Sequence, residues 1–159
     1  MSKHPNLYYN MKEYKITGTR KSMGRIIAIA NQKGGVGKTT TAINLSACLA
    51  EAEKKVLTID MDPQGNTTSG LGVDKNDCEN TIYQLILGEC TFEEALIHTE
   101  FDYLDLIPSN VNLAGAEIEL LNIENREYVL RNEIEKVKDN YDFIIIDCPP
   151  SLNMLTVNA

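Results

Sequence analysis

The chain has 159 residues, of which 43% are hydrophobic and 24% charged, and its net charge is −8. This length favours a single domain, and the composition is that of an ordinary globular protein, which argues against disorder along the whole chain. The acidic balance argues against a protein that coats nucleic acid, because phosphate contacts need clustered lysine and arginine. No apolar run approaches the roughly 20 residues of a membrane span, and the N-terminus lacks the apolar stretch of a signal peptide.

The charge is unevenly distributed along the chain. Residues 1–23 carry a net charge of +4, with five basic residues against the single acid Glu13, and residues 24–159 carry −12. Because residues 1–23 show no apolar periodicity, we expect a basic, disordered extension, or sequence upstream of a true start at Met23. A basic arm that touches DNA or membrane lipid is the alternative. The folded domain is therefore predicted over residues 24–159.

The four cysteines lack the spacing of a metal site or a disulfide framework. No CxxC pair occurs, and no histidine lies at ligand spacing from a cysteine. Disulfide frameworks belong to short secreted domains, so we expect reduced thiols in a cytoplasmic protein. The four residues are Cys48, Cys78, Cys90 and Cys148.

An apolar run, a glycine-rich turn and a helical pattern follow one another after residue 24. Residues 26–30 (IIAIA) are continuously apolar, which is typical of a strand buried on both faces of a parallel sheet. The glycine-rich turn comes next, residues 40–52 have the apolar spacing of a helix, and residues 55–60 (KVLTID) predict a second buried strand. This order is that of the right-handed crossover unit of α/β proteins.

The remaining sequence continues to alternate helices and strands. A short helix is expected over residues 81–87, capped by Asn80 and ended by Gly88, and a capping box at residues 91–94 begins another. The fold class is therefore predicted to be α/β, with a mostly parallel sheet flanked by helices. Further strands are predicted at residues 104–107 and 143–146, and further helices at residues 113–121 and 126–137.

The strongest functional signal lies between the first predicted strand and the first predicted helix. Glycines let the backbone approach phosphate oxygens closely, and the following helix presents its positive N-terminal end to the anion. In such a loop Lys38 adds a positive charge near the β and γ phosphates, and the Thr39 hydroxyl is placed to ligate Mg²⁺. We therefore predict a nucleotide-binding loop made of Lys33, Gly34, Gly35, Val36, Gly37, Lys38, Thr39 and Thr40.

One departure from the common phosphate-loop pattern points to a particular family. The pattern G-x-x-x-x-G-K-[ST] requires glycine at position 32, where this chain has Gln32, and a second lysine, Lys33, precedes the glycines. The segment resembles instead the deviant motif K-G-G-x-G-K-[ST] of the ATPase family that includes ParA, Soj, MinD and the nitrogenase iron protein. The cluster-binding cysteines of the iron protein and the CxxC pair of scaffold-type members are not visible in this sequence.

Three carboxylates that follow predicted strands are candidates for the same site. Asp60 and Asp62 lie at i and i+2 of an extended segment, so both can face a ligand beyond the carboxyl ends of the strands. The family resemblance implies that Asp62 orients or activates the attacking water and that Asp60 supports the Mg²⁺ shell. Asp147 resembles the Walker B acid, which holds Mg²⁺ directly or through water. The alternative for Asp60 and Asp62 is that both are strand-end turn residues beside Pro63.

Within that family, the segment DMDPQGNTTSGLG at residues 60–72 is similar to ParA and Soj rather than MinD. The segments at residues 106–110 and 113–117 also resemble Soj. The resemblance runs from about residue 23 to residue 159, and family members continue well past residues 149–151. It therefore implies a P-loop NTPase fold that is incomplete on its C-terminal side, with residues 24–159 as the N-terminal part of the ATPase domain.

The resemblance also implies a function for the full-length protein. It would bind ATP and Mg²⁺, dimerise with the nucleotides between the two subunits, and hydrolyse ATP slowly to position chromosomes or plasmids. Lys33 would reach the partner's phosphates, so the expected catalytic residues are Lys33, Lys38 and Asp62, and the expected metal-site residues are Thr39, Asp60 and Asp147. A ParB-type centromere-binding partner is implied, with non-specific DNA contacts beyond residue 159 and no membrane contact, in the cytoplasm or on the nucleoid.

Two alternatives stay open at this stage. The first is a nucleotide-binding regulator without useful hydrolysis, acting as a switch in sporulation or cell-cycle control. The second is a fragment that cannot hold ATP, because much of the adenine pocket lies past residue 159 in the family.

Overall fold

The computed structural model describes residues 24–159 as a five-stranded sheet covered by helices on both faces. The predicted basic extension, residues 1–23, lies outside the described residues. Four strands run parallel, and the short β3 pairs antiparallel with β4, so the predicted mostly parallel α/β sheet is confirmed. The strands, in their order across the sheet, are β1 (Arg25–Ile29), β5 (Phe143–Asp147), β2 (Val56–Asp60), β4 (Leu104–Ile107) and β3 (Ile97–His98).

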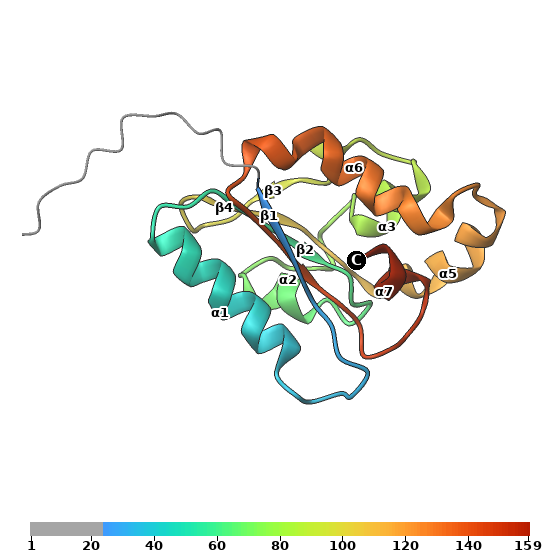
Figure 1. Cartoon of the computed structure of the whole chain (residues 1–159), viewed down its shortest axis with the longest axis horizontal. Coiled ribbons are helices and arrows are strands. Elements are labelled where there is room, and N and C mark those ends of the chain that lie inside the picture. The colour runs from blue at the N-terminus through green and yellow to red at the C-terminus, as the bar shows by residue number, and fades with distance from the viewer. Residues whose placement is uncertain (1–23) are drawn as a thin grey trace, which may run out of the picture.

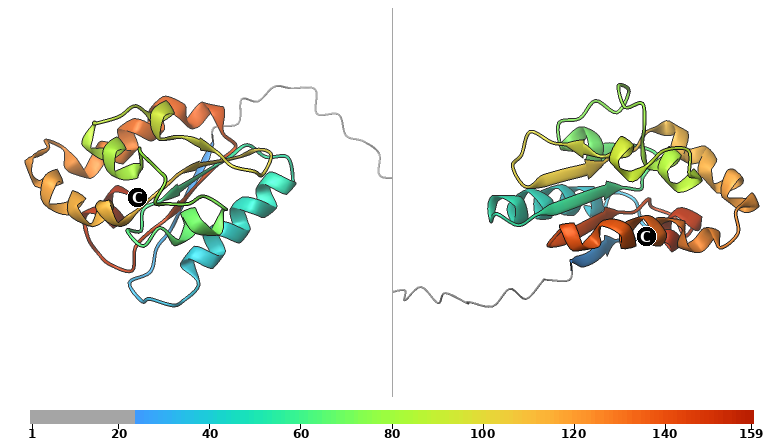
Figure 2. Two further views of the ribbon diagram at one scale, coloured as in Figure 1. Left: turned by 180° about the vertical axis from the view of Figure 1, so that it is seen from behind. Right: turned by 90° about the horizontal axis from the view of Figure 1, so that it is seen from above.

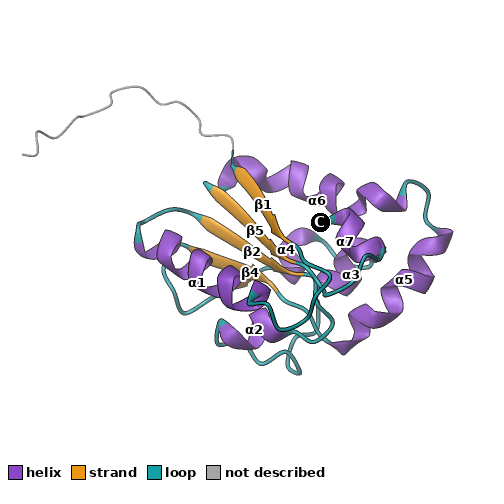
Figure 3. Ribbon diagram, turned by 60° about the horizontal axis from the view of Figure 1, so that its bottom comes forward, coloured by secondary structure: helices purple, strands orange, loops and turns teal. Residues whose placement is uncertain are grey.

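The helices form two layers on the two faces of the sheet (Figures 1 and 3). One layer holds α1 (Lys38–Glu51) and α2 (Asn66–Gly70). The other holds α3 (Ile82–Leu87), α4 (Phe92–Ala95), α5 (Ala116–Glu119), α6 (Val129–Val137) and α7 (Met154–Asn158). Short 3-10 turns adjoin α5 and α6, at Val111–Gly115, Leu120–Asn122, Arg126–Tyr128 and Lys138–Asn140.

The two central strands hold the core together because both of their faces are covered. Alternate side chains of a strand point to opposite faces. Accordingly, Leu57 and Ile144 pack in the larger core with α3, α5 and α6, whereas Val56 and Ile145 pack against α1. The apolar runs of β2 and β5 therefore form buried strands. Each strand ends in an aspartate, Asp60 in β2 and Asp147 in β5, and the two lie at the same edge of the sheet.

The expectation that the first strand is buried on both faces is wrong. β1 pairs only with β5 among the described residues, and it forms the outer edge of the sheet (Figure 2). Its Ile26 side chain is 46% exposed, and Arg25 and Ala28 are exposed as well. An apolar run shows that a strand can be buried, but the neighbouring strands decide whether it is.

Smaller differences concern the helix boundaries. Thr81, not Asn80, caps α3, because the Gln84 side chain three residues later completes a capping box with it. The capping box at Thr91 is confirmed. The helix predicted over residues 113–121 is broken into 3-10 and α-helical turns, the helix predicted from residue 126 begins as a 3-10 turn, and α2 and β3 were not predicted.

Two further observations concern the cysteines and the helices of the described residues. All four cysteines lie within the described residues and are free thiols. No helix in residues 24–159 combines the length and the apolar character that a membrane crossing would need.

The exposed edge of β1 leads to a prediction about self-association. It is apolar at Ile26, and its outer side has no strand partner among residues 24–159, so a second chain can pair with it. We expect the 159-residue chain to associate at tens of micromolar without ATP, and Ile26→Lys to shift it towards monomer, because a charged side chain blocks edge pairing. Size-exclusion chromatography with light scattering measures this.

Ile118→Lys is the control, since Ile118 is also an exposed isoleucine, at 73% against 46% for Ile26, and it lies on α5 and not on β1. It should leave the association unchanged. A monomeric wild-type chain, or equal effects of both substitutions, would contradict the edge-pairing account.

Candidate nucleotide site

The predicted phosphate loop connects β1 to the N-terminus of α1 at the carboxyl edge of the sheet. Gly35 and Gly37 have φ angles of 70° and 91°, which favour glycine over other residues. No side chain caps the N-terminus of α1, a helix of 14 residues, so its first backbone N–H groups remain available to an anion. The glycine backbone is open: an added Cβ at Gly34, Gly35 or Gly37 would meet nothing within 4 Å.

The loop lines a cavity of about 410 Å³. The cavity joins most of the predicted loop to the segment that follows β2. Lys38 lies beside the loop, where its Nζ donates to the Lys33 carbonyl oxygen at 3.4 Å. Lys33 and Val36 are exposed and do not line the cavity. The lining residues are Gly34, Gly35, Gly37, Lys38, Thr39, Thr40, Asp62, Gln64, Asn66 and Pro150.

Asp147 lies at the end of β5, immediately behind the phosphate loop, and is only 1% exposed. Its Oδ2 accepts two hydrogen bonds, from Thr39 Oγ1 at 2.8 Å and from Thr67 Oγ1 at 2.7 Å. Its Oδ1 is buried without a hydrogen-bond partner in the described part of the chain. Burial raises the pKa of Asp147, while the two hydroxyls and the charge of Lys38 act in the opposite direction. The structure therefore brings Thr39 and Asp147 together, as predicted.

Asp60 ends β2 next to Asp147, but it is fully buried and does not line the cavity. Its Oδ2 accepts from the backbone N–H and the hydroxyl of Thr68, both at 2.8 Å, and its Oδ1 accepts from the Asp62 N–H at 3.1 Å. The expectation that Asp60 and Asp62 both face the cavity is therefore wrong for Asp60. Both of its oxygens bond within the protein, so it fixes the loop after β2, and a role in the Mg²⁺ shell stays a prediction.

Burial raises the pKa of Asp60 to about 6 from its ordinary 3.8, against the opposing hydrogen bonds from Thr68 and Asp62. Nearby Asp147 adds to the rise. A carboxyl group with a raised pKa binds its proton more tightly in the folded chain than in the unfolded one. The contribution of Asp60 to folding stability therefore falls as pH rises from about 4 to about 6.

Asp62 does line the cavity, on a loop held from both sides. Its Oδ1 accepts from the Gln64 N–H at 2.9 Å, and its carbonyl oxygen accepts from the Ser109 hydroxyl at 2.8 Å. Gly65 has a φ of 61°, and a Cβ there would lie 2.7 Å from the Ser109 carbonyl oxygen. Only glycine fits at this position, so the turn that carries Asp62 packs tightly against the end of β4.

Sequence reasoning missed three residues of this arrangement: Thr67, Thr68 and Ser109. All three are fully buried, and each hydroxyl bonds to a residue of the site or its loop. The sequence contains only a weak indication of these three residues. Two adjacent threonines lie shortly after the Asp60–Asp62 segment, at positions 67 and 68, and Ser109 follows a predicted strand, where ligand-binding residues gather in α/β sheets.

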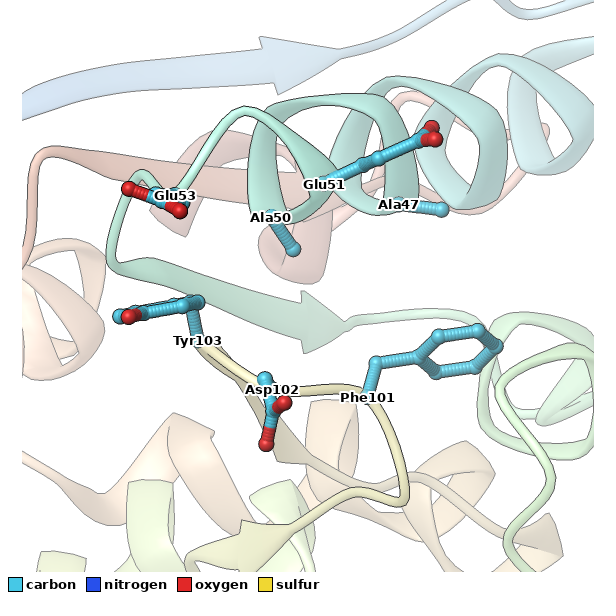
Figure 4. Close-up of a pocket in the computed structure, with 7 residues that line it drawn as sticks. All are labelled: Ala47, Ala50, Glu51, Glu53, Phe101, Asp102 and Tyr103. Carbon is cyan, nitrogen blue, oxygen red and sulfur yellow. The ribbon is translucent and has the colours of Figure 1, made fainter.

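A second hollow, of about 420 Å³, lies at the other end of the sheet (Figure 4). It lies between the C-terminal end of α1 and the residues just before β4, where Phe101 and Tyr103 are half exposed. Its lining includes three carboxylates and no basic side chain, so it repels phosphate groups. The residues are Ala47, Ala50, Glu51, Glu53, Phe101, Asp102 and Tyr103. Of these two hollows, the cavity at the phosphate loop is therefore the candidate nucleotide site.

The phosphate-loop residues also fit a Mg²⁺ ion. Mg²⁺ takes oxygen ligands and is commonly held by one or two carboxylates together with substrate phosphates and waters. The buried, unpartnered Oδ1 of Asp147 and the Thr39 hydroxyl supply such oxygens. Within residues 24–159 no cluster of three or more His, Cys, Asp or Glu residues forms an all-protein metal cage. The donor set thus suits a metal shared with a nucleotide.

Comparison with known proteins shows the family to which the chain belongs. A family model described as an AAA domain matches residues 24–159. The chain is 56% identical over 137 residues to the sporulation initiation inhibitor protein Soj of Bacillus subtilis, covering 86% of this chain and 54% of Soj. It is 54% identical over 138 residues to the chromosome partitioning protein ParA of Myxococcus xanthus, covering 87% of this chain and 49% of ParA.

Solved structures of nucleotide-binding proteins share this fold. A cobyrinic acid a,c-diamide synthase from Mycobacterium smegmatis, with a bound ATP analogue and magnesium, superposes with a TM-score of 0.82 at 44% identity, covering 85% of this chain and 55% of that one. A plasmid partition protein from Borrelia burgdorferi bound to AMPPNP gives 0.74 at 35% identity, covering 86% and 57%. The chain spans about half the length of these relatives. The chain belongs to the ParA/Soj family of P-loop partitioning ATPases.

Proposed function

We propose that this chain binds ATP with Mg²⁺ and is the N-terminal part of an ATP-driven dimerisation switch that acts in chromosome or plasmid segregation. It would carry the catalytic residues of that switch. The observation that carries the proposal is the arrangement at Asp147. Two hydroxyls fix one of its oxygens, and the other oxygen is left unpartnered behind an open phosphate loop. Relatives with this fold hold an ATP analogue or ADP together with magnesium.

Nucleotide binding rests on the loop and the helix behind it. The uncapped N-terminus of α1 and the open glycine backbone offer N–H groups to the phosphates. Lys38 supplies a positive charge at the same place. Thr39 and Asp147 would hold Mg²⁺, directly or through water, with Asp60 in support. When bound, the ion neutralises charge on the β and γ phosphates.

Hydrolysis is assigned to two further residues. Asp62 lines the cavity on a loop fixed by Ser109, Gly65 and Gln64, so its carboxylate is held where it can orient a water molecule against the terminal phosphate. Lys33 is exposed and lies outside the lining of its own chain's cavity. This placement supports a role across a dimer interface, on the phosphates bound by a second copy.

The proposed switch assembles the dimer with ATP and releases it after hydrolysis. The names of two relatives, both chromosome partitioning proteins, support segregation as the setting. A ParB-type partner and non-specific DNA are the proposed contacts of the whole protein. The name of the Bacillus relative, a sporulation initiation inhibitor, favours the second candidate: a nucleotide-dependent regulator without useful hydrolysis. ATP turnover with and without DNA and a ParB-type protein separates the two, since the regulator would show no stimulation.

Lys38→Ala tests the binding site. The substitution should abolish nucleotide binding without unfolding the chain, because it removes a charge from the phosphates and no buried contact. In a thermal-shift assay with Mg²⁺ and ATP at 100 times the dissociation constant, the unsubstituted chain should gain roughly 2.7 kcal/mol and the variant nothing. Lys54→Ala, at an exposed lysine outside the cavity, is the control and should keep the gain. Equal shifts for both variants would refute the phosphate-loop assignment.

Asp62→Ala and Lys33→Ala test the catalytic roles in a protein extended to the full length of the relatives. Asp62→Ala should keep ATP binding and lose about 100-fold or more in turnover, which is the usual contribution of a general base. Lys33→Ala should also keep binding, but lose the ATP-dependent dimer or its turnover. Phosphate release and light scattering measure both, with the exposed acid Glu124 changed to Ala as control. Ordinary turnover in the Asp62→Ala chain would remove Asp62 from catalysis.

A further inference from the structure

The roles proposed so far leave one buried hydroxyl of the site without a function. Thr67 is fully buried near the start of α2, and its Oγ1 donates to Asp147 Oδ2 at 2.7 Å. It does not line the candidate nucleotide cavity, so we expect no direct contact between Thr67 and the nucleotide. Any part that Thr67 plays in the reaction therefore passes through Asp147.

The geometry at Asp147 shows what the hydroxyl does there. Thr39 Oγ1 donates to the same carboxylate oxygen at 2.8 Å. Two donors on one oxygen fix the rotation of the carboxylate and leave the other oxygen, Oδ1, for the cation or its water. Thr39 belongs to the phosphate loop, whereas Thr67 belongs to the segment after β2. The Asp147 carboxylate therefore ties these two segments to each other.

The next residue fastens the same turn of α2 to the neighbouring strand. Thr68 donates its N–H and its hydroxyl to Asp60 Oδ2, and its hydroxyl accepts from the Ser109 N–H at 2.9 Å. Asp60 and Asp147 are register partners in adjacent strands. Thr67 thus bonds to the end of β5, and Thr68 bonds to the end of β2. The two threonines anchor the segment that carries Asp62.

We propose that Thr67 is a positioning residue that links cation binding at Asp147 to the conformation of the loop carrying Asp62. The inference rests on the proposed function, since it presupposes that Mg²⁺ binds at Asp147 with the nucleotide. A carboxylate held by Thr67 draws the start of α2 towards the phosphate loop. A cation held at Oδ1 would fix the position of the carboxylate, so the loop would be fixed from Asp60 at one end to Thr67 at the other.

The test compares Thr67→Val, which keeps the shape and removes the hydroxyl, with Thr67→Ser, which keeps the hydroxyl. The matched control is Thr58→Val, because Thr58 is equally buried and donates to Ser46 Oγ at 2.8 Å, away from the carboxylates. The first readout is the affinity of the 159-residue chain for a non-hydrolysable ATP analogue, measured by calorimetry with Mg²⁺ and with EDTA. The ratio of the two dissociation constants measures how strongly binding of the analogue depends on Mg²⁺.

The second readout is amide hydrogen exchange over residues 65–71, with the analogue and with or without Mg²⁺. In Thr67→Val we expect the affinity ratio to fall about 10-fold or more, as is typical when a residue behind a metal ligand is removed. The Mg²⁺-dependent protection of residues 65–71 should disappear with it. Thr67→Ser and Thr58→Val should keep both, even if Thr58→Val lowers the melting temperature.

The possible failures are distinct. An unsubstituted chain that does not bind the analogue, or binds it equally with EDTA, would overturn the proposed function and this inference together. An unsubstituted chain with a clear Mg²⁺ effect, alongside a Thr67→Val chain that keeps the affinity ratio and the protection, would overturn the role of Thr67 alone. Equal losses in Thr58→Val would reduce Thr67 to a residue that only stabilises the fold, and would likewise overturn its positioning role.

Discussion

The site depends on two buried carboxylates, Asp60 and Asp147, at neighbouring positions on β2 and β5. Burial raises the pKa of both, and the charge of Asp147 raises the pKa of Asp60 further. A buried charge is unfavourable unless hydrogen bonds compensate it, and a hydrogen bond to a charged group contributes roughly 1.5–3 kcal/mol. Here the compensation comes from Thr39, Thr67 and Thr68. Satisfying these carboxylates therefore fixes the phosphate loop and the start of α2.

The two sides of the cavity consequently differ in how open they are. The phosphate-loop side is open, with exposed glycines and an uncapped helix N-terminus that suit an incoming anion. The Asp62 side is closed by packing, because Gly65 lies against Ser109 and the Ser109 hydroxyl holds the Asp62 carbonyl oxygen. A preformed support of this kind would hold the proposed catalytic carboxylate, Asp62, in place before substrate arrives. An ATPase needs both features, and here a single sheet edge provides them.

The sequence predicted the parts of this arrangement that depend on local patterns. The phosphate loop, the strands β2, β4 and β5, and the aspartates that end β2 and β5 carry short-range signals. Thr81 was also predictable, since Gln84 completes its capping box. The link between Thr67 and Asp147 was not, because 80 residues separate them and only the strand order brings them together. The exposure of β1 likewise depends on which strands flank it and not on its own residues.

The central claim is that the phosphate loop and Asp147 together hold a metal–nucleotide complex. The most direct measurement is a crystal structure of the chain with a non-hydrolysable ATP analogue and Mn²⁺, located by its anomalous scattering. The account predicts one anomalous peak between the phosphates and Thr39, on the Oδ1 side of Asp147, with Thr67 still donating to Oδ2. A nucleotide bound elsewhere, or a peak remote from Asp147, would contradict it.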